Sequence, residues 1–295
     1  MPGPVRALAA NRDVAGWVEG LPALVTELER AWGITVGRAY GDSTEAWVAE
    51  AVTAAGTPAV VKVFVPGRPD KAAYETTVLR LAGGQGCVRL LDARPGALLL
   101  ERLGPSLSRL GLGIRERHEI LCAAAEALWR PAPDAGLPTG ATKARAQVTG
   151  IPGAWEALGR PCSEAAVAQA VAAAGRRADA HDDERAVLLH GDVHQWNTLR
   201  TADGTGYALV DPDGLLGERE LDLGVLLRED LEDVTVGDLR DRAARIAART
   251  GTDPAAIWDW GLVERMSNGL ACLVDGLEHH GRISLALADR AAAGT

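Results

Sequence analysis

This 295-residue sequence lacks long apolar runs and closely spaced cysteines, and each absence excludes a class of protein. No apolar run approaches the ~20 residues that a bilayer-spanning helix needs, and the N-terminal segment lacks the apolar stretch of a signal peptide. The four cysteines lie far apart and form no CxxC pair, a distribution typical of reduced cytosolic thiols. We therefore predict a cytoplasmic protein that has no membrane partner.

Basic residues are outnumbered, with 31 lysines and arginines against 40 aspartates and glutamates and a formal charge of −9. No basic stripe runs along the chain, so the electrostatic footprint of a nucleic-acid-binding protein is missing. The acidic balance suits a cationic small-molecule ligand better. Acidic runs such as residues 229–233 are interpreted as solvated helix faces, the usual fate of such runs.

The first third of the sequence is rich in strand patterns, and the remainder is rich in helix patterns. Short segments with β-branched or alternating apolar residues are separated by turn signals, and a helical pattern interrupts them. We expect strands over residues 34–41, 46–53, 59–65, 88–93 and 97–100, with a helix over 70–82. Further helices are expected over 14–32, where Pro22 allows a kink, over 116–129, within 141–185 and from 221 onward, with a hairpin at 198–210.

These elements indicate an α+β protein with two lobes. Its hydrophobic fraction of 47% and charged fraction of 24% are ordinary for a soluble globular chain, and the length allows two compact parts. Residues 1–101 would form a five-stranded antiparallel sheet plus a helix. Residues 102–105 would connect this lobe to residues 106–295, which are mainly helical, and we expect a monomer or weak dimer.

The segment from His190 to Asn197, with the sequence HGDVHQWN, is the most informative part of the chain. Asp211 follows Asn197 by fourteen residues, beyond the predicted hairpin. Phosphoryl transfer depends mainly on positioning and on neutralising phosphate charge, so a few polar groups suffice. We predict that Asp192 orients an acceptor hydroxyl and that Asn197 and Asp211 hold Mg²⁺.

The same segment allows a second interpretation. His190 and His194 are four residues apart, as in a helical zinc pair. Gly191 and the strand-like residues 186–189 favour a loop instead, in which His190 braces the backbone by hydrogen bonding.

The catalytic segment and Asp211 resemble the catalytic loop and metal-binding turn of the aminoglycoside phosphotransferase family, whose pattern HGDxHxxN is matched at every position. Residues 16–24, 99–103 and Asp222-Leu223 are similar to the streptomycin and hydroxyurea phosphotransferase branch, which often has HWD where this chain has HGD. The resemblance covers nearly the whole chain. It implies a two-lobed protein-kinase-like fold, with a nucleotide-binding N-lobe, a hinge connector and a C-lobe that contains the catalytic loop and the substrate pocket.

Lys62 is a charged residue within the apolar segment 60–64, where an unpaired ammonium group would be costly. An edge strand would let its side chain reach solvent. The resemblance instead implies that Lys62 contacts the α- and β-phosphates of ATP and that Glu75, thirteen residues later, positions it. Asp70 and Glu101 are alternative partners.

Two further segments belong to the nucleotide site that the resemblance implies. Ser43 and Thr44, in the turn between the first two strands, would contact phosphate oxygens, although an ordinary hairpin turn would look the same. Glu101 and Leu103, at the connector, would offer backbone hydrogen bonds to adenine.

Polar residues after the metal-binding turn are possible substrate contacts. Asp213 would face a cationic substrate or lie behind Mg²⁺. Asn268 and Asp275 belong to a segment, which also contains Glu264, that resembles the wall of the family's substrate pocket. The resemblance gives Asp222 the role of bracing the catalytic loop. A solvated helix face is the alternative for Glu264, Asn268 and Asp275.

The predicted activity is Mg²⁺-dependent transfer of the ATP γ-phosphate to a hydroxyl of a small polar, cationic molecule, with streptomycin-like aminoglycoside antibiotics as first choice. A metabolic kinase of an amino sugar or amino alcohol is the alternative with the same chemistry. A nucleotide-binding pseudokinase is an alternative of another class, and the complete set of catalytic residues argues against it.

Overall fold

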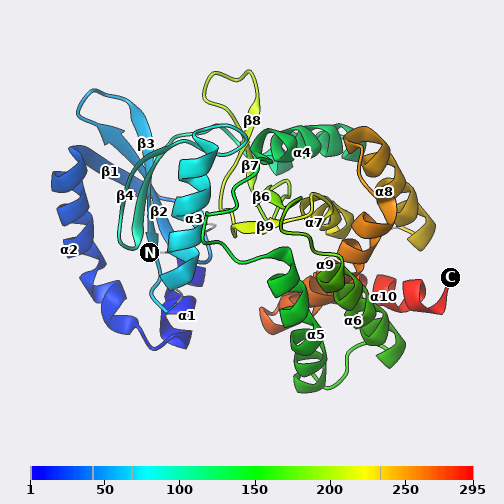
Figure 1. Ribbon diagram of the computed structural model, residues 1–295. Coiled ribbons are helices and arrows are strands. Elements are labelled where there is room, and N and C mark those ends of the chain that lie inside the picture. The colour runs from blue at the N-terminus through cyan, green and yellow to red at the C-terminus, as the bar shows by residue number, and fades with distance from the viewer. Residues whose placement is uncertain (1, 42, 68, 233, 295) are drawn as a thin grey trace. The chain divides into compact units, whose positions relative to one another are not determined.

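The computed structural model describes residues 2–41, 43–67, 69–232 and 234–294. The chain forms two compact units. The first consists of Met1–Pro105 with Leu199–Asp213, and the second of Ser106–Thr198 with Gly214–Thr295 (Figure 1). The chain therefore returns to its first unit to add one hairpin.

The first unit is built on a five-stranded sheet in the order β1-β2-β3-β5-β4. Every neighbouring pair of strands is antiparallel, and β3 is central, between β2 and β5. This arrangement confirms the predicted sheet. The strands are β1 Ile34–Ala39, β2 Ala46–Thr53, β3 Pro58–Phe64, β4 Leu90–Arg94 and β5 Ala97–Glu101.

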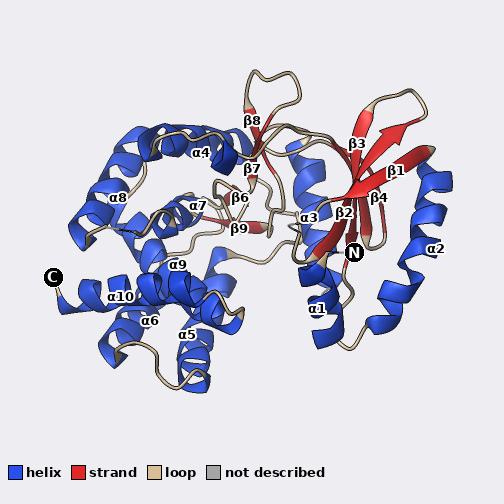
Figure 2. Cartoon of the chain, turned by 180° about the vertical axis from the view of Figure 1, so that it is seen from behind, coloured by secondary structure: helices blue, strands red, loops and turns tan. Residues whose placement is uncertain are grey.

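Helices cover both faces of this sheet. Successive side chains of a strand point to opposite faces, and the buried residues at odd-numbered positions of β2 and β3 pack with α1 (Gly3–Asn11) and α2 (Ala15–Trp32). The other face is turned toward α3 (Pro69–Ala82), and both views show the sheet between α2 and α3 (Figures 1 and 2). Helix α2 continues through Pro22, so the chain is not interrupted there.

Helix α1 was not predicted from the sequence. Its Val5 and Ala9, four residues apart, have no exposed surface and belong to the core between the helices and the sheet. A helix this short is marginal in isolation, so its stability comes from this packing rather than from local propensity.

The hairpin of β7 (Thr198–Arg200) and β8 (Tyr207–Leu209) is attached to the first unit by main-chain hydrogen bonds. The N–H of Val88 donates to the carbonyl of Leu209 at 2.8 Å, and the N–H of Gly104 donates to the carbonyl of Arg200 at 2.7 Å. Residues 210–213, which follow β8, are thereby placed in the same unit as β3.

The second unit is mainly helical, as predicted. Helix α9 (Pro254–Val274) runs through its core and packs against α6, α7, α8 and α10. None of the helices in the described part of the chain is long and apolar enough to cross a membrane. The other elements are α4 Ile114–Leu128, α5 Gly140–Ala157, α6 Glu164–Asp179, β6 Val187–Leu189, β9 Leu215–Gly217, α7 Glu220–Val225, α8 Val236–Thr250 and α10 Glu278–Ala293.

Helices α7 and α9 approach each other so closely that only glycine fits at position 224. A Cβ atom on Gly224 would lie 2.3 Å from the Cβ of Trp260. Trp260 is 1% exposed, and its indole N–H donates to Glu218 at 2.6 Å, so it is held in place. This contact fixes α7, which carries Asp222, against the core.

Candidate functional site

Lys62 is the centre of a buried ion cluster in the first unit. Its Nζ donates to both carboxylate oxygens of Glu75, at 2.8 and 2.7 Å, and it also pairs with Oδ1 of Asp211. Lys62 and Glu75 are almost completely buried, whereas 49% of the Asp211 side chain is exposed. One cation therefore contacts two carboxylates, of which Asp211 is the one that a ligand can reach.

Lys62 lies on the central strand β3, so its interpretation as an edge-strand lysine is wrong. Burial alone would lower the pKa of Lys62, but the carboxylates of Asp211 and Glu75 outweigh burial and raise the pKa above its ordinary value. The ammonium group is therefore charged at neutral pH. Of the two alternative partners, Glu101 bonds elsewhere, and the side chain of Asp70 lies outside the described part of the structure.

The turn between β1 and β2 contains a polar group that is not satisfied. Oγ of Ser43 is buried and has no hydrogen-bond partner among the described residues. A buried hydroxyl left in this state costs about 1–3 kcal/mol. Thr44 beside it is exposed, and Asp42 lies outside the described residues. Among the described residues of this turn, Ser43 is therefore the one whose side chain would gain most from a hydrogen bond to a ligand atom.

Asp213 is partly neutralised by a lysine of α3. Lys71 pairs with Glu45 and lies 3.5 Å from Oδ1 of Asp213. Burial lowers the pKa of Lys71, but the carboxylates of Asp213 and Glu45 outweigh it and raise the pKa. Asp213 keeps 45% of its side chain exposed, so a cationic ligand would have to compete with Lys71 for it.

The two connector residues differ in what they can offer a ligand. The N–H of Glu101 already donates to the carbonyl of Arg89 at 3.0 Å, and its carboxylate accepts from the N–H of Arg89 at 2.8 Å. The main chain of Leu103 makes no hydrogen bond to another described residue. The amide of Leu103, unlike that of Glu101, is available to a ligand.

In the second unit, the loop from His190 to Asn197 follows β6 and is held by Asp222 of α7. The carboxylate of Asp222 accepts the N–H groups of Gly191 at 2.7 Å and His190 at 3.2 Å. Gly191 has a φ of +86°, a conformation that glycine adopts without strain. Nδ1 of His190 in turn accepts the N–H of Asp192 at 3.2 Å. The predicted bracing roles of Asp222 and His190 are confirmed.

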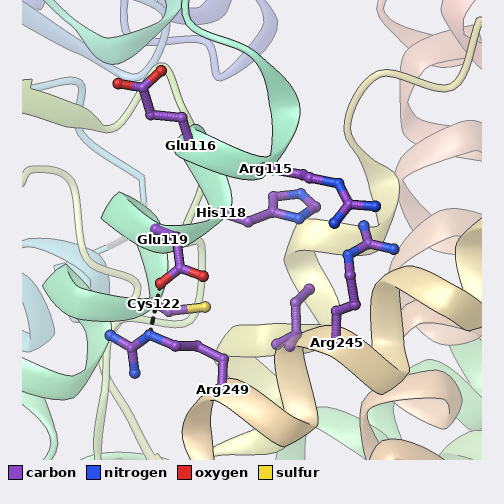
Figure 3. A pocket seen from close by; sticks show the side chains of 8 residues that line it. Arg115, Glu116, His118, Glu119, Cys122, Arg245 and Arg249 are labelled. Atoms are coloured by element: carbon purple, nitrogen blue, oxygen red, sulfur yellow. Dashed lines mark hydrogen bonds and ion pairs between the residues drawn. The ribbon is translucent and has the colours of Figure 1, made fainter.

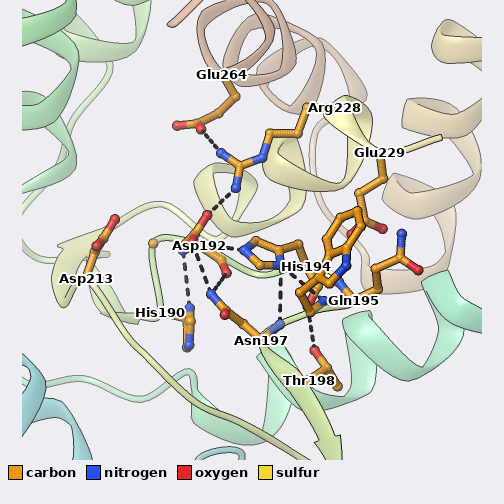
Figure 4. A network of polar contacts seen from close by, with 12 residues as sticks. His190, Asp192, His194, Gln195, Asn197, Thr198, Asp213, Arg228, Glu229 and Glu264 are labelled. Atoms are coloured by element: carbon orange, nitrogen blue, oxygen red, sulfur yellow. Dashed lines mark hydrogen bonds and ion pairs between the residues drawn. The ribbon is translucent and has the colours of Figure 1, made fainter. Parts of the chain in front are cut away.

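Asp192 lies at the centre of this loop (Figure 4). Its Oδ1 pairs with Arg228, and its Oδ2 is 3.1 Å from Nε2 of His194 and 3.0 Å from Nδ2 of Asn197. Nδ1 of His194 accepts the N–H groups of Trp196 and Asn197 at 3.2 and 3.3 Å, so Nε2 carries the ring proton and donates. An ionised carboxylate has about four acceptor positions. Oδ2 accepts two of these hydrogen bonds and Oδ1 accepts one, so one acceptor position remains free, on Oδ1.

Arg228 connects this carboxylate to helix α9. Its guanidinium group also donates to Oε2 of Glu264 at 3.0 Å, and Lys143 lies 2.9 Å from Oε1 of Glu264. Lys143 also donates to the carbonyl of Gly191 at 3.2 Å, so this network contacts the main chain of the loop as well as the side chain of Asp192. Arg228 and Lys143 could not be identified from the sequence, because neither belongs to a recognisable motif.

The surroundings of Asp192 keep it ionised. Burial alone would raise the pKa of Asp192, but the positive charge of Arg228 and the hydrogen bond from His194 outweigh burial and hold the pKa well below its usual range. A carboxylate with so low a pKa is a weak base. Its geometry is therefore better suited to orienting a hydroxyl group than to removing its proton early.

The far end of the loop is held by Glu229. This residue is 3% exposed and accepts the N–H of Gln195 at 2.7 Å, so the expectation that the run 229–233 is solvated is wrong at Glu229. Burial raises the pKa of Glu229. Trp196, the next residue of the loop, is 60% exposed and presents a flat apolar surface to solvent.

Glu264 and Asn268 share one face of α9, because positions four residues apart return to nearly the same side of a helix, and Asp275 is the residue directly after the end of this helix. Glu264 is buried, Asn268 is half-buried and Asp275 is exposed. At 1.5 Å per residue, Asn268 lies about 6 Å and Asp275 about 16 Å from Glu264 along the axis. Only a long ligand could contact both Asp192 and Asp275.

The loop does not form the helical zinc pair that the spacing of His190 and His194 allowed, because the chain is not helical there. Among the described residues, no group of three or more His, Cys, Asp or Glu side chains could hold a metal ion. Mg²⁺ does not need such a group, since it binds one or two protein oxygens together with phosphates and water. Asn197, whose Nδ2 donates to Asp192 and whose Oδ1 remains as an oxygen ligand, and the half-exposed Asp211 each fit this role.

Known proteins share this sequence pattern. The family model described as aminoglycoside/hydroxyurea antibiotic resistance kinase matches residues 35–275. A hydroxyurea phosphotransferase from Kitasatospora aureofaciens is 32% identical over 276 aligned positions, and the alignment covers 91% of this chain and 77% of that protein. A streptomycin 6-kinase from Streptomyces glaucescens is 30% identical over 288 aligned positions, and the alignment covers 92% of this chain and 89% of that protein.

Solved structures share the fold. The aminoglycoside phosphotransferase APH(4)-Ia, in a ternary complex with ADP and hygromycin B, aligns with a TM-score of 0.63 over 91% of this chain and 97% of that chain, at 16% identity. An ethanolamine kinase from Plasmodium vivax aligns with a TM-score of 0.58 over 87% of this chain and 82% of that chain, at 12% identity. These likenesses confirm the predicted kinase-like fold. Together with the family match, they establish that the chain belongs to the aminoglycoside/hydroxyurea antibiotic resistance kinases and is a phosphotransferase.

Proposed function

We propose that this phosphotransferase moves the γ-phosphate of ATP to a hydroxyl group of a small cationic acceptor, with streptomycin-like aminoglycosides as first choice. The observation that carries the proposal is the state of Asp192, which is ionised, fixed by three donors and left with one acceptor position on Oδ1. A hydroxyl that donates to this position keeps an oxygen lone pair for attack on phosphorus.

The nucleotide would be bound by the cluster around Lys62. We assign Lys62 to the α- and β-phosphates, with Glu75 as its buried counterion and Asp211 as its exposed one. Ser43 and Thr44 would contact phosphate oxygens, and the unsatisfied Oγ of Ser43 supports this assignment. The ADP bound by the structurally similar APH(4)-Ia supports a nucleotide site in the same fold.

Two further assignments concern adenine and the metal. The main chain of Leu103, with the carbonyl of Glu101, would bond to adenine, because the amide of Leu103 is unused. Asn197 and Asp211 would hold Mg²⁺, which supplies neutralisation of phosphate charge when it is bound. Both residues provide the oxygen donors that this cation prefers.

Asp192 would act mainly by orientation. As the acceptor oxygen bonds to the γ-phosphorus, the bond from phosphorus to the ADP oxygen breaks, and late in the transfer the hydroxyl proton passes to Oδ1 of Asp192. In a loose phosphoryl-transfer transition state the leaving bond is largely broken before the new bond forms. The hydroxyl therefore needs alignment more than early deprotonation, and a carboxylate with a lowered pKa is sufficient.

The acceptor would lie along the face of α9 that carries Glu264. Asn268 presents a polar group on this face, Asp275 presents an anionic group directly after the end of the helix, and Asp213 offers a half-exposed carboxylate elsewhere. Carboxylates placed in this way favour an acceptor with positive charge. The two relatives are named for acceptors of very different size, streptomycin and hydroxyurea.

The test is Mg²⁺-dependent ADP release from ATP, measured with streptomycin, other aminoglycosides, hydroxyurea, amino sugars and amino alcohols as acceptors. We expect the largest response to streptomycin. Asp192→Ala should lower turnover by about 100-fold or more while nucleotide binding and the far-ultraviolet circular dichroism spectrum stay unchanged. Asp241→Asn, an exposed carboxylate on α8, is the matched control and should behave as wild type.

Near-native turnover of Asp192→Ala would overturn the catalytic assignment. A response to one amino sugar or amino alcohol, with none to the antibiotics, would keep the catalytic residues and replace the acceptor. Nucleotide binding without turnover on any acceptor would favour the pseudokinase alternative.

A further inference from the structure

A cavity in the second unit is unrelated to the residues assigned so far. It lies between α4 and α8 and has a volume of about 210 Å³, many times the ~10–15 Å³ that one water molecule requires. Its walls include Arg115, His118 and Cys122 from α4, and Arg245 and Arg249 from α8 (Figure 3). The cavity is therefore large enough for an oxyanion with a small substituent, and its walls are rich in cations.

One end of the cavity has two arginines that are not in ion-pair contact with a described carboxylate. Arg115 and Arg245 point their guanidinium groups toward the same end, beside the ring of His118, and the carboxylate of Glu116 points away (Figure 3). Neither arginine forms an ion pair within the described ranges of the chain. Two like charges on facing helices repel each other, so an anion between them would stabilise the pair.

The other end of the cavity is neutralised. Arg249 donates to Glu119 at 2.8 Å and to Glu126 at 2.9 Å. Both carboxylates are engaged by this one arginine, and Figure 3 shows the carboxylate of Glu119 on the side of Arg249, away from Arg115 and Arg245. The asymmetry confines the unbalanced positive charge to the end that contains His118.

His118 provides a second, independent sign of a ligand. It is 5% exposed, and its Nε2 is buried without a hydrogen-bond partner among the described residues. Burial, together with the positive charges of Arg242, Arg245 and Arg117, lowers the pKa of His118 to about 3. The ring is therefore neutral at physiological pH and has one N–H, which Nε2 can present to an acceptor atom.

We propose that this cavity is a binding site for a small phosphate-bearing anion, held by the guanidinium groups of Arg115 and Arg245 and by the Nε2–H of His118. Arginine suits this ligand because its planar group donates two parallel hydrogen bonds to phosphate oxygens. A neutral histidine adds a donor without adding a third repelling charge. Free phosphate and a phosphate monoester share this chemistry, and the volume of the cavity accommodates either.

The first experiment is thermal unfolding with increasing inorganic phosphate or glycerol phosphate, at constant ionic strength adjusted with chloride. At ten times the dissociation constant, we expect the unfolding temperature to rise by about 3–6 °C. The double variant Arg115→Gln/Arg245→Gln should lose this saturable rise. Arg240→Gln, which removes an exposed cation from the same helix α8 away from the cavity, should retain it.

The nucleotide site is a rival binding site for phosphate, and two further measurements separate it. Lys62→Met/Glu75→Gln should keep the phosphate-dependent rise, and tungstate soaked into crystals should give an anomalous peak between Arg115, Arg245 and His118. A tighter response to phosphate would identify a free anion as the ligand, and a tighter response to glycerol phosphate would identify an ester.

An equal rise in Arg115→Gln/Arg245→Gln and in wild type would overturn the proposal, as would the absence of any rise beyond that of chloride. If the double variant does not fold, the single variant Arg115→Gln and the position of the tungstate peak decide. A peak only at Lys62 would refute the site.

Discussion

Arg228 forms an ion pair with Asp192 and donates to Glu264 at 3.0 Å, so one guanidinium group joins the proposed catalytic carboxylate to the core helix α9. We predict that Arg228→Gln raises the pKa of Asp192, because the main positive charge beside it is removed. Activity that needs the ionised carboxylate is lost as the pH falls through this pKa. The acidic limb of kcat/KM should therefore move to higher pH, by about 1–3 units.

Arg176→Gln is the control for this profile. Arg176 pairs with Asp259 at 2.6 Å and is 54% exposed, so its replacement should leave the acidic limb where it is in wild type. An unshifted limb in Arg228→Gln would mean that Arg228 only anchors α9 and that another group determines the pKa of Asp192.

The cluster around Lys62 predicts a specific loss of nucleotide affinity. Lys62→Met/Glu75→Gln removes the buried cation together with its buried counterion, so no unpaired buried charge remains from this pair. Because a charge-assisted contact contributes about 1.5–3 kcal/mol, the Kd values of ATP and ADP should both rise by roughly 10- to 100-fold. Isothermal titration calorimetry measures both.

Arg80→Gln, an exposed cation on the same helix as Glu75, should leave these affinities unchanged. If the double variant bound ATP as tightly as wild type, Lys62 would be a structural cation and the phosphate assignment would have to be abandoned.

The face of α9 predicts that acceptors of different length respond differently to one substitution. Asp275 lies about 16 Å along the helix from Glu264, so only a long cationic acceptor can reach it from Asp192. Asp275→Asn should raise the KM for streptomycin by about 2- to 5-fold, the effect of one exposed charge pair. The KM for hydroxyurea should not change.

Glu278→Gln removes a nearby exposed carboxylate that already pairs with Arg282, and it should alter neither KM. A rise in the KM for hydroxyurea with Asp275→Asn would refute this geometry. The long acceptor would then have no separate subsite at the end of α9.

Gly224 predicts a large difference between two glycine substitutions in helices. In Gly224→Ala the new methyl group overlaps Trp260, so stability should fall by about 2–3 kcal/mol. In Gly175→Ala, within α6, no heavy atom lies within 4 Å of the added Cβ, so stability should rise by about 0.5–1 kcal/mol. Urea unfolding measures both, and a neutral Gly224→Ala would show that α7 can move away from α9.

Local patterns were sufficient to predict the sheet of the first unit. Strand β2 has the predicted bounds, because alternation and the flanking turn residues determine its ends without help from distant parts of the chain. Lys62 also stood out, since a lysine in an apolar strand requires a partner. Glu75 proved to be that partner because the helix after β3 returns over the face from which Lys62 projects.

The remaining site could not be predicted in the same way. Arg228, Glu264 and Lys143 come from three segments far apart in the sequence, and no spacing indicates that they meet. Glu229 belongs to an acidic run typical of a solvated surface, and its burial depends on its bond to the loop residue Gln195. Helix α1 was missed for a related reason, since packing rather than pattern stabilises it.

The return of Leu199–Asp213 to the first unit has a practical consequence for anyone dividing the chain. A recombinant fragment that stopped at Pro105 would leave Val88 and Gly104 without their main-chain acceptors and Lys62 without Asp211. A stand-alone version of this unit would have to splice the hairpin back through an artificial linker. The boundary visible in the linear sequence is therefore not a place where this protein can be cut into two working pieces.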